Sequence, residues 1–253
     1  MTREFKSVRS FFTFKNTVKT RFRHVLDSES SDFVETVAET SHSREKTLSQ
    51  GKEFYRARLG CQDLGYDVNG SRNIAPYEEE GLRPRKDGAV EGRANPKGIP
   101  VFYCALECPT AIGEMRPPQG AHVSWGRFYA RRDLRLVDCA AFDECPTFEE
   151  LLTFLNIEPD AREKERVVWC QISAAFSEPV ARQDDSADYI PTQILAEVFK
   201  REGFDGIIYR SAMCPNGNNV VICDLKCLVF IKSGLVKVNK VSLDLADIID
   251  DHS

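Results

Sequence analysis

Long apolar runs and histidines are both scarce in this sequence. No apolar stretch approaches the roughly 18 residues that a bilayer crossing needs, so we expect no association with a membrane. The histidines are His24, His42, His122 and His252. No Cys-x2-Cys pair accompanies them, so they complete no zinc-like set and we predict no metal site. His122 lies alone in an expected strand, where a structural role is the simpler interpretation, and this disfavours hydrolases that depend on a catalytic histidine.

The common catalytic signatures are missing as well. The sequence has no Gly-x-Gly-x-x-Gly after a strand, no Walker lysine loop, no His-Glu-x-x-His and no Gly-x-Ser-x-Gly. Each of these motifs builds a specific phosphate, zinc or nucleophile site. Their absence removes the most frequent nucleotide-binding and hydrolase classes from consideration.

What is present is an average globular composition with an uneven charge. The 253 residues are 42% hydrophobic and 29% charged, which fits one large domain or two small ones with a proper core. The net charge is −5. Residues 1–25 carry seven Lys or Arg against one Glu, a local charge of +6 that leaves −11 for the rest.

The basic start admits three interpretations: an arm for nucleic acid or membrane, a transit peptide, or a helix with a solvated basic face. Val18, Phe22 and Val25 are spaced along one helical face, which favours the packing helix. The early Phe residues alternate with charges, so no signal peptide is expected.

Nine cysteines are present, an odd number in a long chain. Several sit in apolar, strand-like runs, which favours reduced, buried thiols in a cytoplasmic protein over a disulfide scaffold. They are Cys61, Cys104, Cys108, Cys139, Cys145, Cys170, Cys214, Cys223 and Cys227.

The pattern along the chain predicts a helical extension over residues 1–50 and an α+β domain over residues 51–253. The extension should hold two helices, the second from about residue 32 to a polar end at 41–50. Expected strands are 54–59, 99–105, 122–130, 134–138, 166–172, 206–210, 219–223 and 228–232. Expected helices are 109–116, 147–156, which opens on a capping box, and 191–202. Residues 60–98, rich in Gly and Pro, form the least regular part.

Polar residues at strand and helix ends are the remaining candidates for chemistry. Arg56 and Arg58 share one face of a strand, Arg93 follows the Gly-rich segment, Glu114 lies in an apolar helical turn, and Ser211 precedes a turn. Taken singly, each is better explained as an ordinary surface or turn residue.

Their order is more specific. The run Gly92-Arg93-Ala94-Asn95-Pro96-x-Gly98-Ile99-Pro100-Val101-x-Tyr103, then Ala111-Ile112-Gly113-Glu114, closely resembles the RES domain family, named for its Arg, Glu and Ser. The serine matches Tyr209-Arg210-Ser211-Ala212, with Pro215 and Asn219 downstream. Tyr55-Arg56 fits the family's opening pair, so the resemblance covers roughly residues 54–232.

The resemblance implies an α+β fold with a mixed or antiparallel β core and flanking helices, similar to ADP-ribosyltransferase toxins. It also implies a cytoplasmic toxin of a toxin–antitoxin pair that degrades NAD⁺, with NAD⁺ as substrate and no resident cofactor. Glu114, Arg93 and Ser211 would be catalytic, and Arg56, Arg93, Asn95, Tyr103 and Ser211 would bind NAD⁺. The implied partner is a helix-turn-helix (Xre-type) antitoxin, through which alone the protein would meet nucleic acid, and a homo-oligomer is left open.

Three products are compatible with this chemistry: hydrolysis to ADP-ribose, phosphorolysis, or ADP-ribosyl transfer to a macromolecule. Arginine-directed transferases carry a second Glu two residues before the catalytic one, a position that Ile112 occupies here. The alternative interpretation is a non-enzymatic domain that binds a nucleotide or a partner protein and uses the basic N-terminal helix for the interaction.

Overall fold

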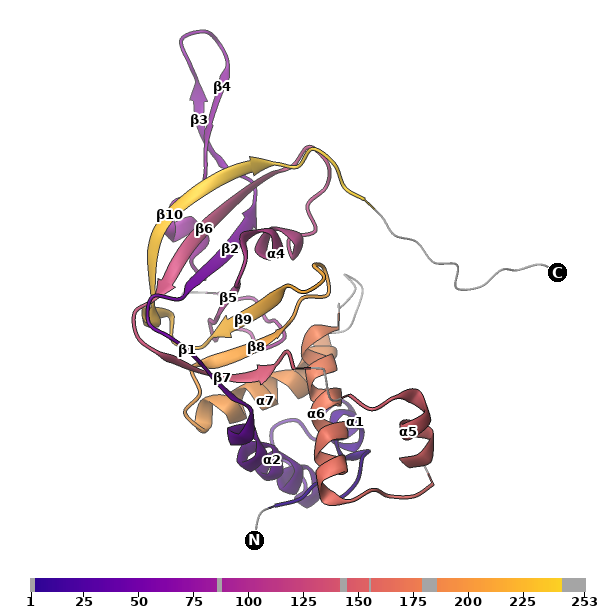
Figure 1. Cartoon of the computed structure of the whole chain (residues 1–253). Helices are drawn as coiled ribbons and strands as arrows, with labels where there is room; N and C mark the ends of the chain where they lie inside the picture. The colour runs from indigo at the N-terminus through magenta and orange to yellow at the C-terminus, as the bar shows by residue number, and fades with distance from the viewer. Residues whose placement is uncertain (1–2, 86–87, 142–144, 155, 179–185, 243–253) are drawn as a thin grey trace, which may run out of the picture.

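The computed structural model describes residues 3–85, 88–141, 145–154, 156–178 and 186–242. Its centre is an eight-stranded, strongly curved sheet (Figure 1). Across the sheet the strands run β1 (Glu45–Leu48), β7 (Leu134–Cys139), β8 (Gly206–Arg210), β9 (Asn218–Ile222), β5 (Phe102–Ala105), β2 (Glu53–Leu59), β6 (His122–Ala130) and β10 (Leu228–Lys237). The β7–β8 pair is parallel and the other neighbouring pairs are antiparallel. The predicted α+β class, with a mixed β core and flanking helices, is confirmed.

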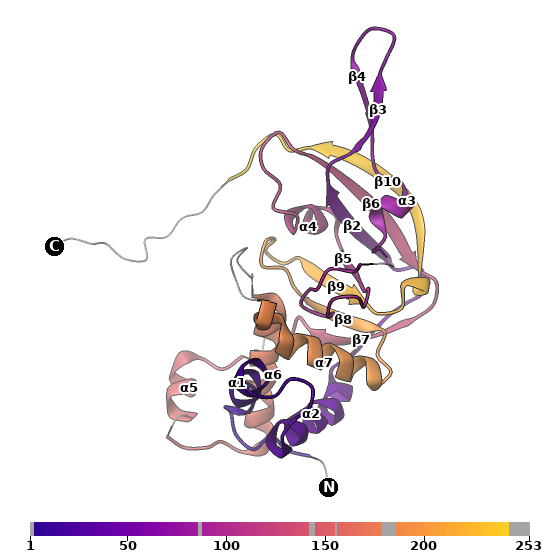
Figure 2. The same ribbon diagram turned by 180° about the vertical axis from the view of Figure 1, so that it is seen from behind.

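Four helices form a layer beside the β7–β8 end of the sheet (Figures 1 and 2). They are α1 (Ser10–Thr20), α2 (Ser28–Ser41), α6 (Ala161–Ser177) and α7 (Ile190–Arg201). The short helix α5 (Phe148–Phe154) lies at the outside of this layer. Helix α4 (Cys108–Gly113) packs instead on β2, at the other half of the sheet.

The Gly-rich segment before β5 is more ordered than its composition predicts. It holds a hairpin of β3 (Gln62–Tyr66) and β4 (Arg72–Ala75), which projects away from the body, and a single helical turn, α3 (Glu79–Leu82). Short 3-10 turns occupy His42–Arg44, Ser186–Tyr189 and Leu225–Cys227. The expectation of an irregular region is therefore wrong for this hairpin, whose strands pair only with each other.

The core lies on both faces of the sheet. Between the sheet and the helix layer, Trp169 stacks on Phe199 with ring centroids 6.0 Å apart. On the opposite face, Phe102 meets Phe128 edge to face at 4.8 Å. Burying aromatic side chains of this size supplies much of the hydrophobic stabilisation of a domain.

The first two helices share the core of the helix layer. Phe11, Phe14 and Val18 of α1 are buried there, as the packing-helix interpretation predicts. The helix ends at Thr20, however, and Phe22 and Val25 are 49% and 79% exposed, so the expected stripe is wrong beyond Val18. The boundary at residue 50 stays a prediction.

Helix α2 begins earlier and ends earlier than predicted. It starts at Ser28 because the Asp27 carboxylate accepts a hydrogen bond from the Ser30 backbone N–H and caps the first turn. After Ser41 the chain continues into β1, which pairs with β7, so the polar stretch expected to close the helix is partly a strand.

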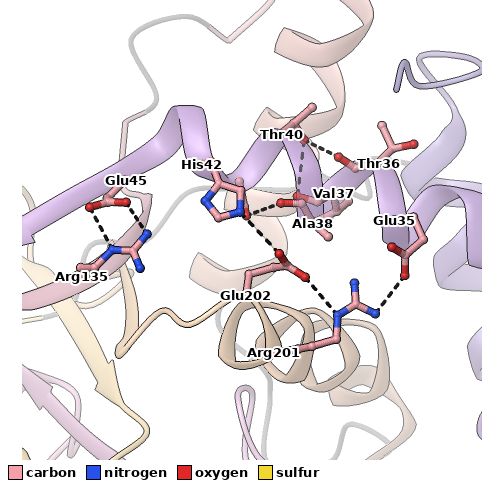
Figure 3. Close-up of polar contacts among 11 residues, drawn as sticks. Glu35, Thr36, Val37, Ala38, Thr40, His42, Glu45, Arg135, Arg201 and Glu202 are labelled. Atoms are coloured by element: carbon pink, nitrogen blue, oxygen red, sulfur yellow. Dashed lines mark hydrogen bonds and ion pairs between the residues drawn. The ribbon is translucent and has the colours of Figure 1, made fainter. Parts of the chain in front are cut away.

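Ion pairs fasten α2 to the end of α7 (Figure 3). Arg201 donates to Glu35 at 2.9 Å and to its neighbour Glu202 at 3.1 Å. Glu202 also lies 3.4 Å from the His42 ring. Arg201 thus links α2 to α7, the helix that, as shown below, holds the Arg93 loop.

The strand expected at residues 166–172 is wrong, because this segment lies within α6. The run Val167-Val168-Trp169-Cys170 has the composition of a strand. The buried residues of α6 are Val167, Val168, Trp169, Ile172, Ser173 and Phe176, and the spacing from Val168 to Ile172 and Phe176 is that of a helix. Asp160 caps the helix by accepting from the Glu163 N–H at 2.9 Å.

The expectation of reduced cysteines throughout is also wrong. Cys145 and Cys170 form a disulfide, with Cα atoms 5.5 Å apart and a sequence separation of 25. Helix α6 brings Cys170 next to Cys145, in the segment before α5. The predicted strand at residues 166–172 gave no reason to expect this proximity. Three of the free thiols are buried as predicted: Cys104, Cys139 and Cys227.

The other predicted elements are confirmed within a few residues at their ends. The capping box before α5 forms as expected: Glu150 accepts from the Thr147 N–H at 2.6 Å, and Thr147 accepts from the Glu150 N–H at 3.3 Å.

Candidate functional site

A cavity of about 400 Å³ opens between α4 and the strands β2, β5, β8 and β9. Glu114, Arg56, Tyr103 and Asn219 contribute to its walls. Three of these four residues were predicted from the sequence to be at the site. The fold therefore brings together positions from the start, middle and end of the α+β domain.

Glu114 directly follows α4, whose last residue is Gly113. A Cβ on Gly113 would lie 2.6 Å from the Cys214 sulfur, so a larger residue there would require the Cys214 side chain to move away from the end of this helix. This close approach places the Glu114 carboxylate against the Ser211–Cys214 turn.

Two donors converge on one oxygen of that carboxylate. Ser211 Oγ donates to Glu114 Oε1 at 2.6 Å, and Asn219 Nδ2 donates to the same oxygen at 2.8 Å. The serine oxygen accepts backbone N–H groups from Met213 and Cys214, both at 3.1 Å, which directs its own proton toward Glu114. Within the described part of the chain, Oε2 accepts no hydrogen bond.

Asn219 is a residue of the site to which the sequence assigns no role. It is 5% exposed, lies on β9 and pairs with Ala105 of β5 and Tyr209 of β8. A signal for it does exist: a buried amide inside the apolar run Asn219-Val220-Val221-Ile222 must find a hydrogen-bond partner.

Two arginines lie on the cavity wall, the exposed Arg58 and the half-buried Arg56. The Arg56 guanidinium donates to the Tyr103 carbonyl oxygen at 3.0 Å and lies 5.0 Å from the centre of the Phe102 ring. Burial lowers the pKa of Arg56 to about 10, so the group is still charged at neutral pH. Among the described residues no carboxylate lies within ion-pair distance of Arg56. A half-buried arginine without an ion-pair partner is suited to bind an anion.

Tyr103 contributes its ring to the cavity, while its hydroxyl is already used. The hydroxyl donates to Asn95 Oδ1 at 2.8 Å and accepts from the Ala94 N–H at 2.8 Å. Burial raises the pKa of Tyr103, which keeps the phenol neutral.

Asn95 lies behind this wall rather than in it. Its side chain is 2% exposed, and its amide nitrogen is within hydrogen-bond distance of the carbonyls of Val90, Pro96 and Ile99. Gln193 of α7 adds two more bonds to the same loop, donating to the carbonyls of Gly92 at 2.9 Å and Asn95 at 3.0 Å. The Asn95 amide thus shapes the loop from inside.

Arg93 is not among the residues that line the cavity. Its guanidinium donates to the carbonyl oxygens of Ala175, at 2.9 Å, and Glu178. These carbonyls belong to the C-terminal end of α6, where helix carbonyls lack partners and a cation is favourable. The structure therefore brings Glu114, Ser211, Arg56 and Tyr103 together, and places Arg93 and Asn95 in the loop that supports them.

The family model described as "RES domain" matches residues 66–234, more than half of the chain. This chain belongs to the RES domain family. The match includes Arg93, Glu114 and Ser211, while Arg56 on β2 precedes it. The membership predicted from the order of these residues is confirmed.

Among solved structures, the RES protein is similar to one titled as the M. tuberculosis MbcT–MbcA toxin–antitoxin complex. The identity is 15%, the similarity covers 79% of this chain and 92% of the other, and the TM-score is 0.41. No curated protein matches the chain.

Two kinds of feature are absent from the described residues. No group of three or more His, Cys, Asp or Glu residues there is arranged to hold a metal ion. None of the helices in that part of the RES protein combines the length and the apolar character that a membrane crossing requires.

Proposed function

We propose that this RES protein cleaves the bond between nicotinamide and ribose in NAD⁺. The observation that carries the proposal is the Glu114 carboxylate, held by two donors through Oε1 and exposed to a cavity that also contains an unpaired arginine. A fixed anion and a fixed cation in one cavity suit a substrate that carries phosphates and develops positive charge during the reaction.

Glu114 would stabilise the reacting ribose. Loss of nicotinamide gives an oxocarbenium-like transition state, as in glycoside hydrolysis, and a carboxylate beside it lowers the barrier or activates the attacking group. Ser211 and Asn219 would keep Oε1 in place so that Oε2 faces C1′ of the ribose. Because nicotinamide is a neutral leaving group, the step needs no general acid, which fits a cavity without histidine.

The other residues would bind and orient the dinucleotide. Arg56 is suited to the pyrophosphate because a guanidinium can grip phosphate oxygens in pairs. The ring of Tyr103 is placed to stack on nicotinamide, and Ser211 lies close enough to Glu114 to reach the ribose as well. For Arg93 and Asn95 the hydrogen bonds favour a supporting role, and direct contact of either with NAD⁺ stays a prediction.

The acceptor distinguishes three reactions. Water gives ADP-ribose, inorganic phosphate gives a phosphorylated ADP-ribose, and a macromolecule gives an ADP-ribosylated product. We favour water or phosphate, since Ile112 replaces the second Glu of arginine-directed transferases.

In the cell the protein would be the toxin of a toxin–antitoxin pair, acting on the cytoplasmic NAD⁺ pool. Membership of the RES family supports this role. The partner would be an antitoxin of the helix-turn-helix class, encoded beside it.

The proposal is tested by incubating purified protein with NAD⁺, with and without phosphate, and identifying products by mass spectrometry. We expect nicotinamide in both cases, and a phosphorylated second product only if phosphate is the acceptor. Binding of NAD⁺ without any nicotinamide release would instead identify a non-enzymatic nucleotide-binding domain.

A further inference from the structure

Tyr209 is one of three tyrosines that line the cavity, with Tyr55 and Tyr103, and its environment differs from that of Tyr103. It lies near the end of β8, is 8% exposed, and packs its ring 6.2 Å from that of Phe176. It is paired across the sheet with Asn219. Residues directly opposite in an antiparallel pair project to the same face, so Tyr209 lies beside the amide that holds Glu114.

The hydroxyl of Tyr209 makes no hydrogen bond within the described part of the chain, whereas that of Tyr103 makes two. Tyr209 as a residue is buried, but its hydroxyl is not among the fully buried atoms that lack a partner, so this hydroxyl is accessible from the cavity. The two residues are neighbours in one cavity, so the contrast is not a matter of general exposure. A hydroxyl that is accessible from the cavity and has no protein partner among the described residues is free to bond to a molecule that enters the cavity.

Charge also limits what this hydroxyl can do. Burial raises the pKa of Tyr209, so the phenol stays neutral and keeps its proton. Beside the Glu114 carboxylate, a neutral O–H donor is compatible with the site, whereas a phenolate would repel it. The group is therefore a hydrogen-bond donor toward whatever occupies the cavity.

We infer that Tyr209 is a substrate-binding residue whose hydroxyl donates a hydrogen bond to an oxygen of the nicotinamide–riboside half of NAD⁺. This inference rests on the proposed function. We assign Tyr209 to the nicotinamide–riboside half of NAD⁺ because it adjoins Asn219 and Glu114, the residues proposed to act at the ribose. Arg56 would bind the phosphates. The role concerns affinity and not the chemical step.

The test uses Tyr209→Phe, which removes only the hydroxyl. In the full-length protein we expect KM for NAD⁺ to rise about 5- to 30-fold, with kcat changed by less than about threefold, since one hydrogen bond to the substrate is lost. Calorimetric titration of Glu114→Gln and of Glu114→Gln combined with Tyr209→Phe should show the same loss for NAD⁺ and none for AMP. Tyr129→Phe is the matched control: Tyr129 is a half-buried tyrosine of β6 outside the cavity.

The thermal midpoint separates binding from structure. Tyr209→Phe removes a hydroxyl that has no partner, so the midpoint of the ligand-free protein should stay the same or rise. A lower midpoint would give the hydroxyl a structural role and overturn the inference. Unchanged NAD⁺ affinity and KM would overturn it while leaving the proposed function intact. A wild-type protein that neither binds nor cleaves NAD⁺ would refute both.

Discussion

Asn219→Asp is the substitution that tests the arrangement around Glu114 most sharply. It replaces a donor, 2.8 Å from Glu114 Oε1, with a carboxylate of nearly the same shape. Two carboxylates at that distance cannot both be charged without a large penalty, and pairs of this kind share one proton. At an effective dielectric constant of about 20, the repulsion at 2.8 Å is about 6 kcal/mol, and water in the cavity reduces it.

The expected result is a displaced pH profile. The variant should lose most of its nicotinamide release at pH 7 and recover it as the pH is raised, with the acid limb of kcat/KM at least about 1–2 pH units above that of the wild type. The assay is nicotinamide release from pH 5 to 9. Asn218→Asp, the same change one residue earlier on the opposite face of β9, should leave the profile in place.

Two results would refute this reasoning. If Asn219→Asp has the wild-type profile, Asn219 does not contact Glu114 in the working enzyme. If Asn218→Asp moves the profile equally, the effect reflects added charge in general and not the specific hydrogen bond.

Three further predictions follow from other contacts. Arg56→Gln should raise KM for NAD⁺ about 10- to 100-fold, because a charged hydrogen bond to phosphate is lost. It should also weaken the dependence of KM on salt concentration. An unchanged KM would show that the phosphates bind elsewhere. Gln193→Ala should lower the free energy of unfolding, measured by denaturant titration, by about 1–2 kcal/mol. It should also speed proteolysis near Asn95, measured by limited digestion. A variant as stable and as protease-resistant as the wild type would contradict the role of Gln193 in holding the loop. Reducing the Cys145–Cys170 disulfide, whose cysteines have a sequence separation of 25, should lower the free energy of unfolding by about 3 kcal/mol. Dithiothreitol should therefore lower the thermal midpoint of the wild type but not that of Cys170→Ser. An equal fall in the two proteins would assign the effect to other thiols.

The sequence was sufficient for most elements of the sheet, because apolar strands between Gly- and Pro-rich turns have a clear local pattern. It failed at α6, where Val167-Val168-Trp169 favours a strand by composition and only the spacing of the buried residues from Val167 to Phe176 shows the helix. The disulfide was missed for the same reason, since its partners meet only when α6 is a helix.

At the site, the order of motif residues identified Glu114, Ser211, Arg56 and Tyr103, which do converge. It could not show what each side chain contacts. Arg93 meets carbonyls of Ala175 and Glu178, more than 80 residues away along the chain, and no local pattern predicts such a partner.

The most direct test of the central claim compares nicotinamide release by the wild type, Glu114→Gln and Glu107→Gln at saturating NAD⁺. Glu107, the residue before α4, is a glutamate outside the cavity wall. We predict that Glu114→Gln lowers kcat by about 10²–10⁴-fold, several kcal/mol of barrier, and that Glu107→Gln stays within about twofold. Equal rates for wild type and Glu114→Gln would contradict the account.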